Sequence, residues 1–161
     1  MTTQILDNYL PQEYFNSLKN KILNPAFTWN FIGALNQFQT NNEDTYFVHY
    51  IYEEHEPRSF LWDDLKGLMN NLQVKVLFRA KVNFYLKTKN LVEHARHIDY
   101  DISHKGAILY LNTCDGFTRL HDGTTVESIE NRLLLFDSSQ LHNSTTTTDD
   151  VGRYNININY L

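Results

Sequence analysis

Four residues have the types and spacing expected of a metal site with an anion-binding group beside it. His97 and Asp99 are separated by one residue, so in an extended strand both side chains point to the same side and can reach one ion. His142 comes from a distant part of the chain and would supply a third ligand. Two histidines and one carboxylate that leave coordination positions open are typical of non-haem Fe(II) sites.

The fourth residue, Arg153, follows His142 by eleven residues and begins an alternating strand pattern. Arginine presents a planar fork of donors that binds a carboxylate through two parallel hydrogen bonds. A metal centre next to such a fork predicts a binding site for a keto-acid.

The chain has seven histidines, so other ligand choices must be weighed. His94 is the main rival because it lies three residues before His97 and, from a loop, could swing toward the metal. It lacks the same-face relation that His97 has with Asp99. We expect His49 to be packed or hydrogen-bonded in an aromatic strand. Three further histidines are expected in loops or turns: His55, His104 and His121.

Composition places the chain among ordinary globular proteins. It has 161 residues, 42% apolar and 20% charged, which predicts one domain with a real core. The net charge of -5 argues against a general nucleic-acid binder. A single cysteine, Cys114, excludes an intramolecular disulfide and a cysteine zinc cluster. The first residues do not resemble a secretory signal and no stretch is apolar enough to span a bilayer, so we expect a cytoplasmic protein.

The N-terminal half predicts helices. Residues 11–23 begin with a proline and then place apolar residues at helical spacing, and a second helix carries leucines at steps of four, three and four. Residues 46–52, rich in aromatic and β-branched side chains, predict a strand between them. Two polar stretches, 39–44 and 145–150, are expected to be loops. The helical positions are Phe15, Leu18 and Ile22, then Leu61, Leu65, Leu68 and Leu72.

The remainder predicts strands at 80–87, 107–111, 117–120, 125–129, 133–136 and 153–160. Asp122-Gly123 predicts a hairpin turn between the third and fourth of these. In the last strand, Arg153 shares one face with three asparagines, and that face either meets solvent or lines a barrel-like interior. The three asparagines are Asn155, Asn157 and Asn159.

Helices followed by many short strands favour an α+β fold, a double-stranded β-helix (jelly roll) supported by N-terminal helices. We expect a single domain over residues 1–161, with helical support over about 1–73 and the jelly-roll core over about 74–161. A basic run in this core favours a solvated strand face, and the alternative is a surface for phosphate, as in nucleic acid, or for an acidic protein. The run comprises Lys75, Arg79, Lys81, Lys87, Lys89 and Arg96.

In these motifs the chain resembles the Fe(II)/2-oxoglutarate-dependent dioxygenases, and within them the small prolyl-4-hydroxylase-like type of bacteria and their viruses. The order and spacing of the segments carry the resemblance over residues 74–161. They are His97-x-Asp99, Leu109-Tyr110-Leu111-Asn112, Asp115-Gly116-Phe117-Thr118, His121-Asp122-Gly123-Thr124, Arg132-Leu133-Leu134-Leu135-Phe136, His142 and Arg153-Tyr154.

The resemblance implies that Fe(II) is held by His97, Asp99 and His142, and that Arg153 pairs with the distal carboxylate of 2-oxoglutarate. It also implies roles beside this co-substrate for Tyr110, Tyr85 and Asn157. The family uses O2, is in some members supported by ascorbate, and releases succinate and CO2 as it hydroxylates a C–H bond. A prolyl or other protein residue is the expected substrate.

One departure from the wider superfamily narrows the expectation. The DNA-repair branch carries a second arginine six residues after the first, and here that position is Asn159. A protein, peptide or small-molecule partner is therefore favoured over nucleic acid, and oligomeric state stays open. The alternatives are a related oxygenase acting on a nucleobase or small metabolite, and a non-catalytic jelly-roll binding module.

Overall fold

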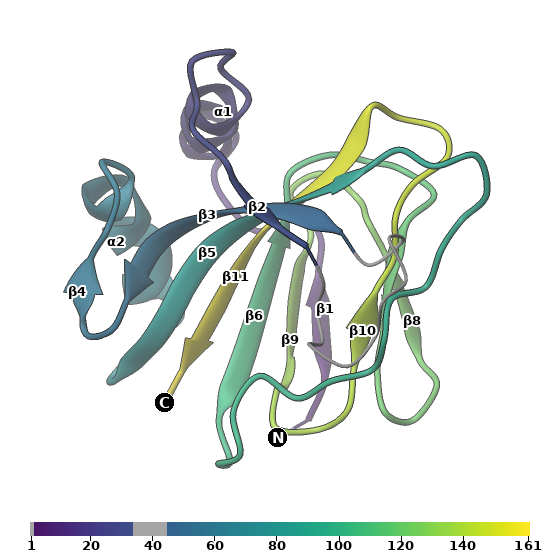
Figure 1. Cartoon of the computed structure of the whole chain (residues 1–161). Coiled ribbons are helices and arrows are strands. Elements are labelled where there is room, and N and C mark those ends of the chain that lie inside the picture. Colours follow the sequence, from purple (N-terminus) through teal and green to yellow (C-terminus); the bar gives the residue numbers. More distant parts are fainter. Residues whose placement is uncertain (1, 34–44) are drawn as a thin grey trace.

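The computed structural model describes residues 2–33 and 45–161. Within them the chain forms two sheets and two helices (Figure 1). The first element is a short strand, and the last is a strand that takes part in the longest antiparallel pairing. The elements are β1 (Gln4–Leu6), α1 (Gln12–Ile22), β2 (Asn30–Ile32), β3 (Tyr46–Glu53), β4 (Glu56–Pro57), α2 (Trp62–Asn71), β5 (Leu77–Leu86), β6 (Lys105–Tyr110), β7 (Phe117–Arg119), β8 (Thr125–Glu127), β9 (Leu133–Asp137), β10 (Asn143–Ser144) and β11 (Gly152–Tyr160).

The main sheet is antiparallel, with strand order β1-β9-β6-β11-β5-β3-β2 and with β4 paired to β3. β11 lies at its centre, hydrogen-bonded to β5 on one side and to β6 on the other. A small sheet of order β10-β7-β8 faces it. Two facing antiparallel sheets with crossovers are the expected jelly-roll arrangement, so the predicted fold class is confirmed.

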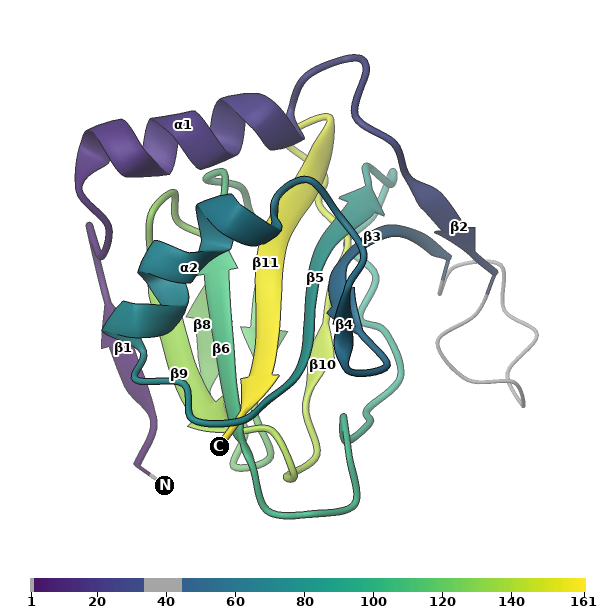
Figure 2. The same cartoon turned by 90° about the vertical axis from the view of Figure 1, so that its left-hand side faces the viewer.

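Both predicted helices form, and they cover one face of the main sheet (Figure 2). Their apolar stripes are buried against the strands, as the periodicity predicted. From the sheet, Ile51, Val82 and Ile156 enter the same core. This apolar layer holds the sheet from behind and leaves its opposite face free to carry other side chains.

The opposite face of β11 carries Arg153 and the three asparagines, and all four side chains are buried. A residue faces the other way from its neighbours in a strand, so Ile156 and Ile158 point to the helices while Asn155 and Asn157 point between the sheets. The interpretation in which this polar face lines an interior is therefore correct.

The small sheet is extended by segments that the sequence analysis did not predict to pair with each other. Isolated bridges join Lys87 to Thr147, Glu93 to Thr145 and His97 to His142. Residues 145–147 are consequently buried, and the prediction of a loop over 145–150 is wrong for that half of it. The other predicted loop, 39–44, lies outside the described residues.

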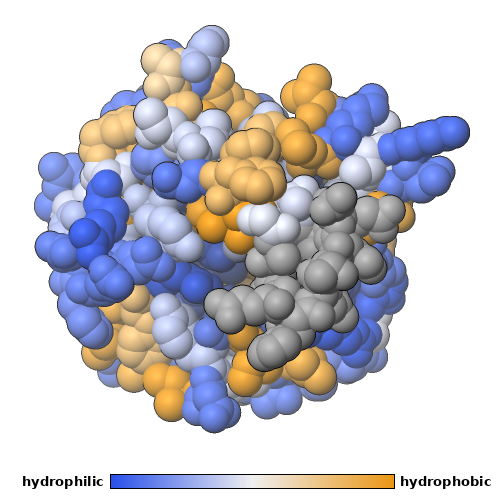
Figure 3. All heavy atoms as spheres, in the orientation of Figure 1, coloured by the Kyte–Doolittle hydropathy of each residue, from blue (hydrophilic) through white to orange (hydrophobic). Residues whose placement is uncertain are grey.

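The hairpin prediction is confirmed. β7 and β8 pair antiparallel, and Gly123 between them has a φ of 88°, a conformation that favours glycine. On the face shown in Figure 3, small groups of apolar side chains are separated by hydrophilic ones. Among the described residues, no helix has the length and apolar character needed to cross a membrane.

Candidate metal and carboxylate site

The structure brings His97, Asp99 and His142 together, with one potential ligand atom from each within 4.8 Å of the others. The Nε2 atoms of His97 and His142 lie 3.9 and 3.7 Å from the Asp99 carboxylate. His97 and Asp99 lie in an irregular extended segment and not in a regular strand as expected. The histidines are coupled directly, because each backbone N–H donates to the other's carbonyl at 2.9 Å.

Both imidazoles are oriented for coordination through Nε2. The Nδ1 atom of His142 lies 2.9 Å from the carbonyl of Gln140, and that of His97 lies 3.3 Å from the carbonyl of Ala95. A hydrogen on Nδ1 donated to a carbonyl leaves the lone pair of Nε2 for a metal.

Asp99 is held by three side chains that the sequence analysis did not assign. Its carboxylate accepts hydrogen bonds from Arg79 at 2.8 Å, Ser138 at 2.6 Å and Asn159 at 2.8 Å. Burial alone would raise the pKa of Asp99, but Arg79, His142 and Lys81 together with the Ser138 hydrogen bond hold it well below the usual range. The carboxylate is therefore ionised and oriented, as a metal ligand must be.

His97 is kept in its neutral, metal-binding form. Burial, and next the proximity of His142, lower the pKa of His97 to about 4, against an opposing effect of Asp99. An imidazole that is neutral at pH 7 needs no deprotonation before it binds a metal.

Arg153 is the least expected side chain in this interior because it is charged and fully buried, at 0% exposure. Its guanidinium donates to the hydroxyl of Thr118 at 2.9 Å and to the carbonyl of Thr145 at 3.4 Å, and its Nε–H finds no partner in the part of the chain that the structure describes. No Asp or Glu among the described residues forms an ion pair with it. A buried charge without a counter-charge is costly, which indicates a site made for an anion.

Two tyrosines flank this guanidinium, at 5.4 Å from each ring centroid. They are Tyr85 and Tyr110, both predicted site residues and both buried. The hydroxyl of Tyr110 donates to that of Thr118 at 2.8 Å. Gly116 is required for the close packing, because a Cβ there would lie 2.6 Å from the Cδ of Arg153.

Asn157, the last predicted site residue, lines the cavity between the histidines and Arg153 together with Asn83. The side-chain oxygens of both asparagines are buried and have no hydrogen-bond partner. Asn83 does donate to Asn155 at 3.0 Å. The cavity itself is only about 20 Å³, so a five-carbon acid must part these side chains to bind. A wider hollow of about 430 Å³ lies elsewhere, beside the end of α1.

His94, the rival ligand, is not part of the metal cluster and packs against Ser144 and Tyr85, two residues of the cavity wall. It is 3% exposed, its Nδ1 lies 2.8 Å from the Ser144 hydroxyl, and its ring lies 5.1 Å from that of Tyr85. Burial, with Arg153 next, lowers the pKa of His94 to about 4. Its buried Nε2 has no hydrogen-bond partner among the described residues, so one nitrogen of the neutral ring is left to donate or accept a hydrogen bond.

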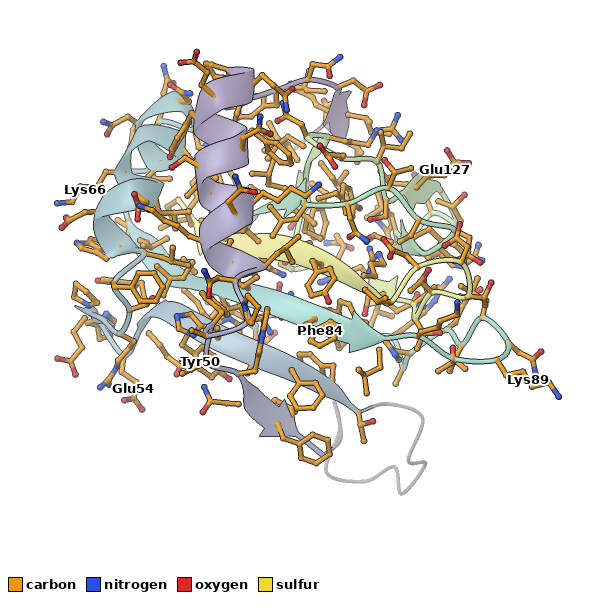
Figure 4. The ribbon with its side chains drawn as sticks, turned by 90° about the horizontal axis from the view of Figure 1, so that it is seen from above. Tyr50, Glu54, Lys66, Phe84, Lys89 and Glu127 are labelled. Carbon is orange, nitrogen blue, oxygen red and sulfur yellow. The ribbon has the colours of Figure 1, made fainter. Side chains whose placement is uncertain are left out.

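The basic run was predicted to be a solvated strand face, and this is wrong for two of its members. Arg79 and Lys81 lie on the inner face of β5, where Arg79 binds Asp99 and Lys81 is 8% exposed. Alternation along β5 carried the signal, since both residues share a face with Asn83 and Tyr85. Lys89, by contrast, projects from the loop after β5 (Figure 4).

Comparison with known proteins gives no matching family model and no matching curated relative. Solved structures do match. A prolyl-4-hydroxylase of Pseudomonas putida superposes with a TM-score of 0.71 at 16% identity, covering 98% of this chain and 91% of that one. A prolyl hydroxylase of Trichoplax adhaerens, in complex with a peptide fragment of the hypoxia-inducible factor degradation domain, gives 0.72 at 17%, covering 99% and 83%.

A third similar structure is SnoN, a non-haem α-ketoglutarate-dependent epimerase of nogalamycin biosynthesis, with a TM-score of 0.70 at 14% identity, covering 99% of this chain and 77% of that one. At such identities the likeness establishes the fold and not the reaction. The chain thus has the jelly-roll fold of the prolyl hydroxylase-like 2-oxoglutarate/Fe(II) oxygenases.

Proposed function

We propose that this chain is a single-domain Fe(II)- and 2-oxoglutarate-dependent dioxygenase that hydroxylates an aliphatic C–H bond. The observation that carries the proposal is the pairing of two features around one small cavity, which is lined by His97 and His142 of the metal cluster and by Tyr85 and Thr118, the neighbours of Arg153. One is the open cluster of His97, Asp99 and His142. The other is the fully buried, counter-charge-free guanidinium of Arg153. A dicarboxylic keto-acid satisfies both, since one end binds a metal and the other end binds an arginine.

The donor set fits Fe(II), because it offers two neutral imidazoles and one ionised carboxylate and leaves coordination positions open. When bound, the metal and 2-oxoglutarate supply the oxidising power for C–H hydroxylation, with O2 consumed and succinate and CO2 released. Arg79, Ser138 and Asn159 keep the Asp99 carboxylate in place throughout. Ascorbate is a supporting reductant to include in assays.

The co-substrate site is built from Arg153, Tyr110, Tyr85 and Asn157. Arg153 binds the distal carboxylate, and Tyr110 orients the Thr118 hydroxyl that shares this task. Tyr85 and Asn157 line the path from the arginine to the metal. The buried walls exclude water, which strengthens the ionic contact of Arg153 with its carboxylate.

For the primary substrate we propose a prolyl or other protein residue first. The support is that two similar structures are prolyl hydroxylases, one of them with a bound peptide. A small metabolite is the second candidate, because another similar structure is an epimerase of a biosynthetic pathway.

The test is succinate release by the Fe(II)-loaded protein in the presence of 2-oxoglutarate, O2 and ascorbate. We expect slow uncoupled release without substrate, and faster release with a mass gain of one oxygen on a substrate from a peptide and metabolite screen. The exposed-loop variant Lys89→Met is the control and should match the wild type. Fe(II)-loaded protein that neither binds 2-oxoglutarate nor releases succinate would refute the assignment.

A further inference from the structure

Lys81 is a buried cation whose one effect described so far is electrostatic, on the Asp99 carboxylate. It lies on the inner face of β5, in register with Tyr50 of β3 and Asn157 of β11. Only 8% of the residue is exposed. Lysine is almost never this deeply buried without a charged partner, so the burial of Lys81 requires an explanation.

Among the described residues, the surroundings of Lys81 supply aromatic rings but no carboxylate that contacts its ammonium. Its ammonium lies 5.5 Å from the ring centroid of Tyr46. Two carboxylates, Asp99 and Glu53, act on it electrostatically, yet no hydrogen bond or ion pair joins either to it within the described part of the chain. Asp99 already accepts three hydrogen bonds from other side chains, so it is not free to turn toward Lys81.

Position along β5 separates Lys81 from the proposed keto-acid pocket. Arg153 pairs in register with Tyr85, four residues from Lys81, which is about 13 Å along a strand. In the opposite direction Lys81 is only two positions from Arg79, the partner of Asp99. Lys81 therefore stands toward the metal end of the interior. β3 is the strand beside β5 on one side, and its residues Tyr46 and Tyr50 form the wall next to Lys81.

We propose that Lys81 determines specificity in the primary-substrate subsite, where its ammonium binds a carboxylate of the substrate next to the metal cluster. This inference rests on the proposed function and names the substrate class for it: an acidic amino-acid residue, a peptide carboxyl end or a small organic acid. The incoming carboxylate supplies the missing counter-charge, and the rings of Tyr46 and Tyr50 contact the carbon skeleton.

The state of the free lysine agrees with this role. Burial, with the nearby Arg79 next, lowers the pKa of Lys81 to about 7, so the ammonium form is destabilised unless a carboxylate pairs with it. A carboxylate at hydrogen-bond distance favours the ammonium form. The subsite thus distinguishes an acid from its amide, which offers no charge.

The test measures binding, not turnover. Protein loaded with Mn(II) in place of Fe(II), under anaerobic conditions and with saturating 2-oxoglutarate, is titrated with matched acid and amide probes. The pairs are N-acetylglutamate α-amide with N-acetylglutamine α-amide, N-acetylaspartate α-amide with N-acetylasparagine α-amide, and N-acetylproline with N-acetylprolinamide. Paramagnetic relaxation of the probe protons by Mn(II) reports both affinity and proximity to the metal.

We expect at least one acid to bind about tenfold more tightly than its amide, the factor given by one charge-assisted hydrogen bond. In Lys81→Met the preference should fall below about twofold, while the affinity for 2-oxoglutarate stays unchanged. Lys89→Met, which removes an exposed charge, should keep the full preference. Lys81→Gln is the second variant should Lys81→Met fail to fold.

Three results would overturn the proposal: no acid preference in any pair for the wild type, a preference that survives in Lys81→Met, or a loss of 2-oxoglutarate affinity in that variant. The last result would assign Lys81 to the co-substrate. Failure of the proposed function is recognised separately, because the wild type would then bind no 2-oxoglutarate by calorimetry before any probe is added.

Discussion

The two faces of the main sheet differ in what they contribute, although the same strands build both. Toward the helices, β11 presents Ile156 and Ile158 to a continuous apolar core. Toward the small sheet it presents Arg153, Asn155 and Asn157, all buried, and among the described residues Arg153 and Asn157 each have a polar atom without a hydrogen-bond partner. Apolar burial stabilises the fold, whereas buried polar groups without partners oppose it.

This difference indicates where stability and chemistry reside. On the helix-facing side, a substitution that removes side-chain atoms leaves a packing defect. The polar side holds groups whose partners are to come from outside the chain, so its substitutions should change ligand binding more than folding. The predictions below test that division, from the largest expected effect to the smallest.

The metal cluster should give the largest effect. Asp99→Ala and His97→Ala each remove a ligand and should abolish 2-oxoglutarate-dependent succinate release, with metal content after dialysis near background. His94→Ala, a matched loss of an imidazole that packs against the cavity wall, should keep its metal. Elemental analysis of the three purified variants is the measurement, and metal loss in His94→Ala but not in His97→Ala would reverse the ligand assignment.

Two substitutions, one on each face of β11, should separate effects on stability from effects on ligand binding. Ile156→Ala leaves a cavity in the apolar core and should lower the free energy of unfolding by about 2–5 kcal/mol. Arg153→Met replaces a buried, unpaired charge with an apolar chain of similar length and should leave the metal-free protein as stable or more stable. Urea unfolding of the two variants is the measurement; a larger loss in Arg153→Met would contradict the division.

Acid should destabilise the metal-free protein through the polar face. The pKa of His94 is about 4 in the fold and about 6.5 when unfolded, so between these values the unfolded chain binds more protons. Stability is therefore present above pH 6.5 and lost as the pH falls toward 4, at up to about 1.4 kcal/mol per pH unit from this histidine. His94→Gln should flatten the profile measured by urea unfolding at pH 7, 6 and 5, and an identical profile would argue against a neutral buried ring.

The smallest effect is expected at Tyr85. Its hydroxyl bonds Ser144 and its ring packs beside the Arg153 guanidinium, so Tyr85→Phe keeps the ring and removes one hydrogen bond. We expect the KM for 2-oxoglutarate to rise by less than about tenfold, the range of one neutral hydrogen bond. Steady-state succinate release is the measurement, and a loss as large as that in Asp99→Ala would give Tyr85 a greater role than proposed.

Sequence periodicity predicted the helices, the hairpin and the alternation of β11, because each depends on local spacing. The His-x-Asp motif and the family resemblance, not periodicity, indicated the three residues that meet at the cluster, His97, Asp99 and His142. Neither found Ser138 and Asn159, whose task depends on contacts between distant segments.

Lys81 was misassigned for a related reason. In a basic run, charge favours solvent. Alternation shows that Lys81 shares a face with Asn83 and Tyr85, but only the register of β5 with β3 and β11 shows that this face points inward. Pairing between distant strands is invisible to periodicity, so polar residues that line an interior resemble polar residues that face water.

The central claim is that Arg153 binds the distal carboxylate of 2-oxoglutarate beside a metal held by His97, Asp99 and His142. The most direct measurement is anaerobic calorimetric titration of Mn(II)-loaded wild type and Arg153→Met with 2-oxoglutarate. The account predicts binding by the wild type and at least about a hundredfold weaker binding by the variant, since a charge-assisted bidentate pair is lost. Equal affinity in the two proteins, or no binding by metal-loaded wild type, would contradict it.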